Sequence, residues 1–367
     1  MSQVQSAITA AANLARKWPQ WPTYGLVDDL LPTIERWSAD GHRVVLATLV
    51  TVVGTSPRPL GSQMAICDTG DVAGYVSGGC VEGAVAAEAL AVLEDGKPRV
   101  LDYGAGSPVL DVQLTCGGRI AIFVHELVDP RDYATRLRAA RTQRAALEIH
   151  IDLESGALRY YTAGAGGPPP PVVTDSSAVF VLPCPPPVRV LVVGGNPVAL
   201  SVCALALRMG YAVDLLRPLG PAVPPPSLDP VHYDRRPIAQ AMAEQDAKLD
   251  AWTAVYALTH HPDEDLVVLA HALRSPAFAV GVLGARSKIR ERLRRLGEAG
   301  LDAAALARLN APAGLALGAR GPHEIALSIL AQIVSLQPHA ECHSARVIPM
   351  TLGPHPASAC QTARAAP

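Results

Sequence analysis

The chain has 367 residues, and 49% of them are hydrophobic, so it is long enough for two ordinary domains with separate cores. Its 31 basic and 33 acidic side chains leave a formal net charge of −2, which argues against a general nucleic-acid binder. No apolar run is long enough for a membrane span and the first residues lack a secretory signal pattern, so we expect a cytoplasmic protein without membrane contact. Seven cysteines without a CxxC pair indicate reduced thiols, not a disulfide framework.

The first half of the chain alternates short strands and helices with glycine and proline turns. Residues 27–37 have helical apolar spacing, and the β-branched run 43–53 predicts a strand that ends at Gly54. Further strands are predicted at 64–67, 72–76, 100–103, 109–114 and 119–125 and as two segments of 147–161, and further helices at 81–93 and 133–146. A proline run at 183–187 predicts a linker after an N-terminal domain of residues 1–182.

After the linker the pattern changes to strand and helix in alternation over residues 188–340. A buried strand at 188–193 leads through a tight turn to a helix at 198–209 and a strand at 211–216. The alternation continues with strands at 254–258 and 277–282 and helices at 263–274, 287–297 and 323–336. We therefore predict an α/β protein whose mixed N-terminal domain precedes a Rossmann-like, doubly wound parallel sheet. The segment 341–367 has no apolar period and is expected to form a tail that is disordered or loosely docked.

Cys80 lies in a loop with a high density of special residues, because Gly78 and Gly79 precede it and Glu82 follows two positions later. Glycines allow backbone conformations that a Cβ forbids, and the small residues after the loop predict the start of a helix. The unpaired N–H groups of a helix N-terminus favour an anion beside them, so a thiolate here is suited to carry sulfur, bind a metal or act as a nucleophile. A small buried hydrophobe is the alternative interpretation of this cysteine.

The glycine loop of the second domain departs from the dinucleotide fingerprint. In G-x-G-x-x-G the second glycine lets the backbone approach a pyrophosphate, but Asn196 holds that position here and Pro197 follows it. The second strand ends at Arg217 where an acidic residue would hold a ribose, and this arginine either meets a phosphate or is solvated. The pattern argues against NAD(P) as a cofactor, although Gly194 and Gly195 stay candidate ligand-binding residues.

Several segments resemble the XdhC/CoxI family of molybdenum-hydroxylase accessory proteins. They are GTSPRPLG at 54–61, SGGCVEG at 77–83, TCGG at 115–118, YALTHHPDEDLVVLAHAL at 256–273, FAVGVLGARSKIRERL at 278–293 and APAGLALGARGPHEIALSILAQIV at 311–334. The resemblance covers roughly residues 30–337. It implies a chaperone that binds molybdenum cofactor, as molybdopterin or its cytosine dinucleotide form, and protects it while a cysteine desulfurase installs a sulfido ligand. Such a chaperone hands the cofactor to a xanthine-dehydrogenase- or CO-dehydrogenase-type apoenzyme, and its partners include the cofactor-synthesis enzymes.

The resemblance and the chemistry of such a cargo together indicate a binding site without catalytic residues. Because molybdenum is held by soft sulfur ligands, Cys80 and Cys116 are the candidates to contact the metal. Arg58 is a candidate for a phosphate, with Ser56 beside it, and Glu82 for orienting the thiol or binding the pterin. The other candidate cofactor-binding residues are Gly78, Gly79, Gly117, Gly118, Gly194, Gly195, Asn196 and His260.

Two other functions remain open at this point. An NAD(P)-binding oxidoreductase would use the C-terminal domain as its catalyst, and an interaction scaffold would only dock partners. We expect an accessory factor more than a turnover enzyme, because the resemblance implies binding and release. The apolar helices leave a homodimer open as well.

Overall fold

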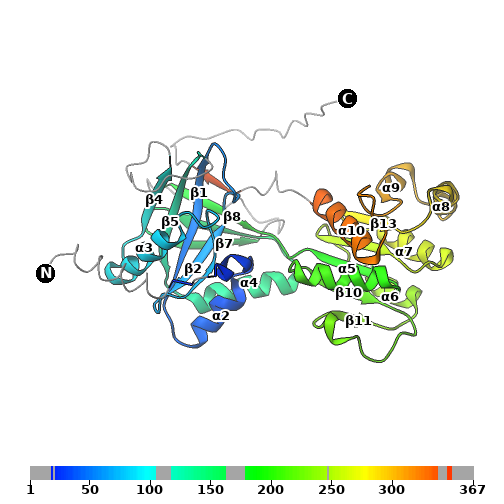
Figure 1. Ribbon diagram of the computed structural model, residues 1–367, viewed down its shortest axis with the longest axis horizontal. Helices are drawn as coiled ribbons and strands as arrows, with labels where there is room; N and C mark the ends of the chain where they lie inside the picture. Colours follow the sequence, from blue (N-terminus) through cyan, green and yellow to red (C-terminus); the bar gives the residue numbers. More distant parts are fainter. Residues whose placement is uncertain are drawn as a thin grey trace. The chain divides into compact units, whose positions relative to one another are not determined.

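The structure is a computed structural model that describes residues 18–19, 21–104, 117–162, 178–245, 248–337 and 345–348. The chain forms two compact units (Figure 1). The first unit contains Met1–Cys184 and His343–Pro367, and the second contains Pro185–Cys342. The boundary therefore lies within the proline-rich segment 183–187, and the chain returns to the first unit near its C-terminus.

The first unit is built on a five-stranded antiparallel sheet with the order β3-β2-β1-β5-β4. Its strands are β1 (Val44–Val53), β2 (Gln63–Cys67), β3 (Val72–Gly74), β4 (Arg99–Gly104) and β5 (Arg119–Leu127). The central strand β1 is buried on both faces, since Val45 and Ala47 join one core and Val44 and Leu46 join another. Burial on both faces explains why the sequence of β1 is a continuous apolar run without polar alternation.

Different layers cover the two faces of this sheet (Figure 1). Helix α3 (Glu82–Asp95) packs on one face and ends at Gly96, whose φ of 69° gives a left-handed cap. On the other face lie α2 (Leu31–Ala39), α4 (Pro130–Gln143) and a second sheet in the order β15-β8-β6-β7. The strands of this sheet are β6 (Leu147–Asp152), β7 (Leu158–Thr162), β8 (Val179–Cys184) and β15 (Arg346–Ile348). Of the predicted tail 341–367, residues 345–348 are described, and they supply β15, where no regular structure was expected.

The second unit contains a parallel six-stranded sheet in the order β11-β10-β9-β12-β13-β14. Its strands are β9 (Arg189–Val193), β10 (Ala212–Leu216), β11 (His232–Asp234), β12 (Thr253–Ala257), β13 (Ala279–Val282) and β14 (Leu309–Asn310). Counted along this unit, the strands lie in the order 3-2-1-4-5-6, which is the Rossmann order with its switch point between β9 and β12. The predicted Rossmann-like parallel sheet is therefore confirmed.

Helices cover both faces of the parallel sheet, as a doubly wound fold requires (Figure 1). One face carries α5 (Pro197–Arg208) and α10 (Pro322–Leu336), and the other carries α6 (Ile238–Gln245), α7 (Pro262–Arg274) and α8 (Ile289–Glu298). The short helix α9 (Ala303–Ala307) precedes β14. Proline opens α5, α7 and α10 at the first helical position, where its missing N–H and fixed φ cost nothing.

Candidate functional site

The three N-terminal motifs, GTSPRPLG, SGGCVEG and TCGG, lie next to one end of the five-stranded sheet. Val53, the last residue of β1, and Gly104, the last residue of β4, both lie opposite Arg119, the first residue of β5. The end of β3 pairs with the start of β2 at the same end of the sheet. The motif segments that emerge there are 54–61, 75–81 and 117–118. Cys116, which directly precedes the third segment, lies outside the described residues.

Glycines let these segments approach one another closely. A Cβ on Gly118 would overlap the carbonyl oxygen of Thr55, and a Cβ on Gly78 would lie 3.3 Å from Cγ of Pro57. Gly117 has a φ of 70°, in the left-handed region that L side chains rarely adopt. The GTSPRPLG loop thus contacts both other motif segments, which are far from it in the sequence.

Glu82 organises the SGGC loop from within. Its side chain is fully buried, with Oε1 accepting the N–H of Ser77 at 2.7 Å. The other oxygen, Oε2, accepts the Ser77 hydroxyl and the Gly79 N–H, both at 2.8 Å. Further N–H donors to the carboxylate come from Val76, Gly78 and Val81. The loop is therefore wrapped around one carboxylate.

This arrangement fixes the charge of Glu82. Burial by itself would raise the pKa of the Glu82 carboxyl, but the hydrogen bonds from Ser77 and its neighbours lower it by more, so the pKa lies below its ordinary value. The sequence offered Glu82 as a partner of the thiol or the pterin. In the structure both oxygens are engaged by the loop itself, a role that only the folded backbone reveals.

Cys80 lies on the outer side of this loop, where its side chain is exposed. Gly78 and Gly79 have φ values of 102° and 107°, so the turn that brings the N–H groups inward requires glycine at both positions. The Cys80 N–H donates to the Ser77 hydroxyl oxygen at 3.2 Å. The loop thus presents a thiol to solvent on a backbone that Glu82 holds in place.

Arg58 is held against the start of the same loop. Its guanidinium lies 4.2 Å from the centroid of the Tyr75 ring, and Nη1 lies 3.3 Å from the Tyr75 hydroxyl and 3.4 Å from Oδ1 of Asp28. The hydroxyl of Ser56 accepts the Arg58 N–H at 3.3 Å. The Nε of Arg58 is buried and has no acceptor among the residues that the structure describes. Tyr75 thus fixes a guanidinium with an unsatisfied donor next to the thiol-bearing loop.

In the second unit the predicted glycine turn lies at the switch point. Asn196 accepts the Ala199 N–H at 3.0 Å, which caps α5, and its amide nitrogen donates to the carbonyl oxygen of Leu258 after β12. Gly194 has a φ of 144°, and a Cβ there would lie 2.5 Å from the same carbonyl oxygen. The turn after β9 is therefore fastened to the end of β12, and both ends of the Asn196 amide are engaged within the protein.

The loop after β12 carries His260 and a buried polar network. His260 is exposed and has a left-handed φ of 67°. The Thr259 hydroxyl donates to Oδ1 of the buried Asp265 at 2.8 Å, and Nη2 of Arg292 lies 3.3 Å from Oδ2. The sequence pointed to His260, and to Arg292 only as one member of a basic helix, but it gave no sign of Asp265 beyond an acidic first turn.

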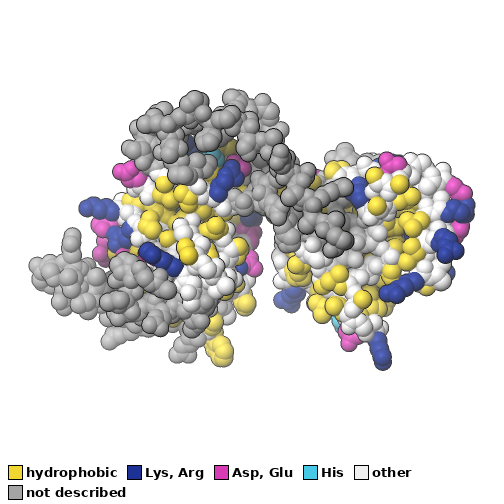
Figure 2. All heavy atoms as spheres, turned by 90° about the horizontal axis from the view of Figure 1, so that it is seen from above, with side chains coloured by type: hydrophobic (Ala, Val, Ile, Leu, Met, Phe, Trp, Pro, Cys, Tyr) yellow, Lys and Arg dark blue, Asp and Glu magenta, His cyan; other side chains and the backbone are white. Residues whose placement is uncertain are grey.

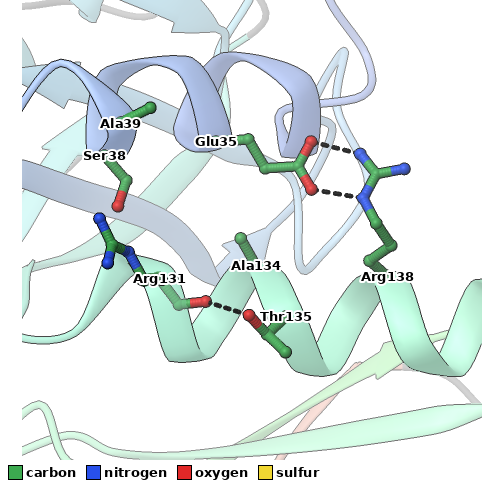
Figure 3. A pocket seen from close by; sticks show the side chains of 7 residues that line it. All are labelled: Glu35, Ser38, Ala39, Arg131, Ala134, Thr135 and Arg138. Atoms are coloured by element: carbon green, nitrogen blue, oxygen red, sulfur yellow. Dashed lines mark hydrogen bonds and ion pairs between the residues drawn. The ribbon is translucent and has the colours of Figure 1, made fainter.

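A separate hollow of about 280 Å³ lies between α2 and α4. Glu35 and Arg138 form an ion pair across it, and the guanidinium of Arg131 points toward Ser38 (Figure 3). None of the residues that line it was singled out by the sequence, so the hollow and the motif loops are distinct features.

The face of the molecule seen in Figure 2 is mixed in charge. In the view of Figure 2, basic and acidic side chains lie near one another on both units. Within the described ranges, no helix combines the length and the apolar composition needed to cross a bilayer. The same ranges contain no group of three or more His, Cys, Asp or Glu side chains placed to hold a metal ion.

Comparisons with known proteins agree with this architecture. The model of the XdhC and CoxI family matches residues 37–104, and the model of the XdhC Rossmann domain matches residues 190–333. The motif loops and the parallel sheet therefore define a two-unit protein that joins these two domain types. The chain is 32% identical over 324 residues to the molybdenum cofactor insertion chaperone PaoD of Escherichia coli (strain K12). This alignment covers 87% of this chain and 93% of that protein. The chain belongs to the XdhC and CoxI family.

Two matches at lower identity also extend over most of the chain. A probable xanthine dehydrogenase subunit of Bacillus subtilis (strain 168) is 24% identical over 319 residues, which is 80% of this chain and 93% of that protein. The crystal structure of a xanthine dehydrogenase from Bacillus halodurans superposes with a TM-score of 0.67 at 22% identity, over 86% of this chain and 97% of that one. At that identity the likeness establishes a shared fold.

Proposed function

We propose that this protein binds molybdenum cofactor in its first unit and inserts it into a molybdenum hydroxylase in the cytoplasm. One observation carries the proposal: three motif segments from separate parts of the chain meet at one end of the five-stranded sheet, with Cys80 exposed among them. A relative at 32% identity, whose name assigns it to molybdenum cofactor insertion, supports the same function.

The chemistry of the loops fits such a cargo. A thiolate is a soft ligand suited to molybdenum, so Cys80 contacts the metal or its sulfur, together with Cys116 from the segment before Gly117. Arg58, fixed on Tyr75, offers guanidinium donors to the phosphate of the pterin, and Ser56 lies beside it. Because Glu82 already holds the loop, the thiol is presented without a prior rearrangement of the backbone.

Release is as important as binding for an insertion factor. In molybdenum cofactor the metal is already held by the dithiolene of the pterin, so one or two protein thiols complete its coordination and do not build it. Because only one or two protein–metal bonds must break, the cofactor can pass from this protein to the apoenzyme. We extend the proposal to protection of the cofactor during sulfuration by a cysteine desulfurase, with molybdopterin or its cytosine dinucleotide as the cargo.

The test is cofactor content. The full chain is purified from a host that makes molybdenum cofactor, and fluorescent pterin after oxidation and molybdenum are quantified per chain. Cys80→Ala is compared with Cys184→Ala, whose thiol lies in β8 of the second sheet. The wild type and Cys184→Ala are expected to contain pterin and molybdenum. Cys80→Ala is expected to lose both. Equal cofactor in all three proteins, or none in any, contradicts the proposal.

A further inference from the structure

Strand β15 belongs to the first unit, although it follows the whole of the second unit in the sequence. It pairs antiparallel with β8 at the edge of the second sheet, and it also contacts β1, beside which it is drawn in red (Figure 1). The three ladder pairs are Arg346 with Val181, Val347 with Phe180 and Ile348 with Val179. The chain therefore returns to the sheet that lies against the motif-bearing one.

The residue before β15 contacts the end of the GTSPRPLG loop. Gly61, the last residue of this loop, has a left-handed φ of 83°, and a Cβ there would lie 3.1 Å from Cβ of Ala345. The same Cβ would lie 2.9 Å from Cδ1 of Leu182 in β8, while the Gly61 N–H donates to the Leu49 carbonyl of β1 at 2.8 Å. Gly61 is thus confined by β1, by β8 and by the approach to β15.

The loop is stiff enough to carry this confinement to its functional residues. Pro57 and Pro59 flank Arg58, and each proline fixes its own φ, so few torsions between Arg58 and Gly61 are free to absorb a displacement. Ser62 closes the end of the loop, because both its N–H and its hydroxyl donate to the Pro59 carbonyl, at 3.2 and 2.7 Å. A shift at Gly61 is therefore transmitted to the arginine.

Strand β15 is weakly held, and the edge that it covers is apolar. It has three residues and, within the described ranges, a neighbouring strand on one side only. Arg346 is exposed and Val347 is 39% exposed, whereas Phe180 and Val181 of β8 are fully buried. A short edge strand separates easily from its neighbour, and an uncovered apolar edge favours renewed pairing. Detachment of β15 is thus a reversible local opening.

We propose that β15 is a releasable strap that holds the GTSPRPLG loop in its cofactor-binding conformation. With β15 on β8, Ala345 confines Gly61, and the loop presents Arg58 and Ser56 in a fixed arrangement. When β15 leaves β8, the loop loses this support and its hold on the phosphate of the cofactor weakens. The role of the strap in cofactor release rests on the proposed function, whereas its hold on the loop does not.

The experiment compares a locked strap with a loosened one in the full chain. Arg346→Cys combined with Val181→Cys locks it, because paired residues of antiparallel strands have Cα atoms about 4.5–5.5 Å apart, within the range that a disulfide spans. The reduced double variant and the oxidised single variant Arg346→Cys are its controls. Val347→Pro loosens the strap, since proline removes an N–H and restricts φ, and Val347→Thr keeps the β-branched shape as a matched control.

Two quantities are measured: amide hydrogen exchange of residues 54–61 in the cofactor-free protein, and the rate at which bound pterin leaves the loaded protein. A lost ladder hydrogen bond corresponds to roughly 2- to 10-fold in the equilibrium of a local opening. Val347→Pro is expected to accelerate both processes by this factor, and Val347→Thr to match the wild type. The oxidised double variant is expected to slow both processes relative to its reduced form.

The two measurements separate this inference from the proposed function. Exchange in residues 54–61 that changes neither on locking nor in Val347→Pro overturns the strap. Altered exchange with an unchanged rate of pterin release overturns its role in release. Absence of pterin from every protein, the wild type included, contradicts the proposed function, while exchange in the cofactor-free protein still decides whether β15 holds the loop.

Discussion

Replacing Glu82 by Gln removes the charge from the centre of the SGGC loop without changing the size of the side chain. The carboxylate accepts three donors at each oxygen, at distances of 2.7 to 3.2 Å. An amide has one carbonyl oxygen, so the donors on the other side face an NH₂ group in place of an acceptor. Each buried donor without an acceptor costs about 1–3 kcal/mol, so two such N–H groups predict a loss of about 2–6 kcal/mol in the unfolding free energy of the first unit.

The assay combines urea unfolding with amide hydrogen exchange of residues 75–83. Glu82→Gln is expected to shift the unfolding transition of the first unit and to accelerate exchange in the loop. The matched control is Glu88→Gln on the same helix, because Glu88 is 43% exposed and pairs with Arg99 at the surface. Loss of a surface pair of this kind costs less than about 1 kcal/mol. Equal stability and equal exchange in the two variants would refute the role assigned to Glu82.

The pH dependence gives an independent check on the same residue. Because the pKa of Glu82 is lower in the folded protein than its ordinary value of 4.5, the stability it contributes is fully present above pH 4.5 and is lost as the pH falls through the folded-state pKa. The difference in unfolding free energy between wild type and Glu82→Gln should therefore narrow in that range. A difference that stays constant down to the lowest accessible pH would contradict an ionised Glu82.

Three further predictions concern other parts of the fold. Burial lowers the pKa of His125 to about 4, and its contact with the Glu126 carbonyl offsets this only in part. The contribution of the neutral imidazole to the unfolding free energy is therefore complete above pH 6.5 and falls by roughly 3 kcal/mol toward pH 4. His125→Phe should flatten this fall, as measured by thermal unfolding. Asn196→Ala loses a helix cap and a bond to the β12 loop, and should lower the unfolding free energy of the second unit by about 1–3 kcal/mol in urea. Gly118→Ala places a Cβ against the Thr55 carbonyl oxygen and should lower the melting temperature. Gly83→Ala, at the start of α3, adds a Cβ with no atom within 4 Å and should raise the unfolding free energy by about 0.5 kcal/mol.

Each of these predictions has an outcome that would overturn its reasoning. An unchanged pH profile in His125→Phe would show that the buried imidazole is not the titrating group. Asn196→Asp keeps the acceptor that caps α5 but loses the donor to the Leu258 carbonyl, so it should destabilise the second unit less than Asn196→Ala does. If both variants were as stable as the wild type, Asn196 would not join the turn after β9 to the loop after β12. Equal melting temperatures for Gly118→Ala and Gly83→Ala would mean that the loops do not pack backbone to backbone.

Local patterns determined much of the fold. The apolar run of β1, the strand-turn-helix opening of the second unit and the helices that begin at proline were all predictable, because period and breakers act within a few residues. Strand β8 was missed because its last residues, Pro183 and Cys184, coincide with the proline run. The three-residue strands β11 and β15 were also missed, because such short segments are strands only by virtue of the neighbour with which they pair.

The sequence could propose candidate residues for the site but not their arrangement. The sequence by itself identified Cys80, Arg58 and their glycines, because thiols, guanidinium groups and paired glycines are recognisable by type. Only the tertiary structure decided that Glu82 binds its own loop and that Arg217 lies over Gly195. The reason is physical: these partners are set by strand order and by turns with positive φ, and the pairing of strands distant in the chain leaves no trace in a local pattern.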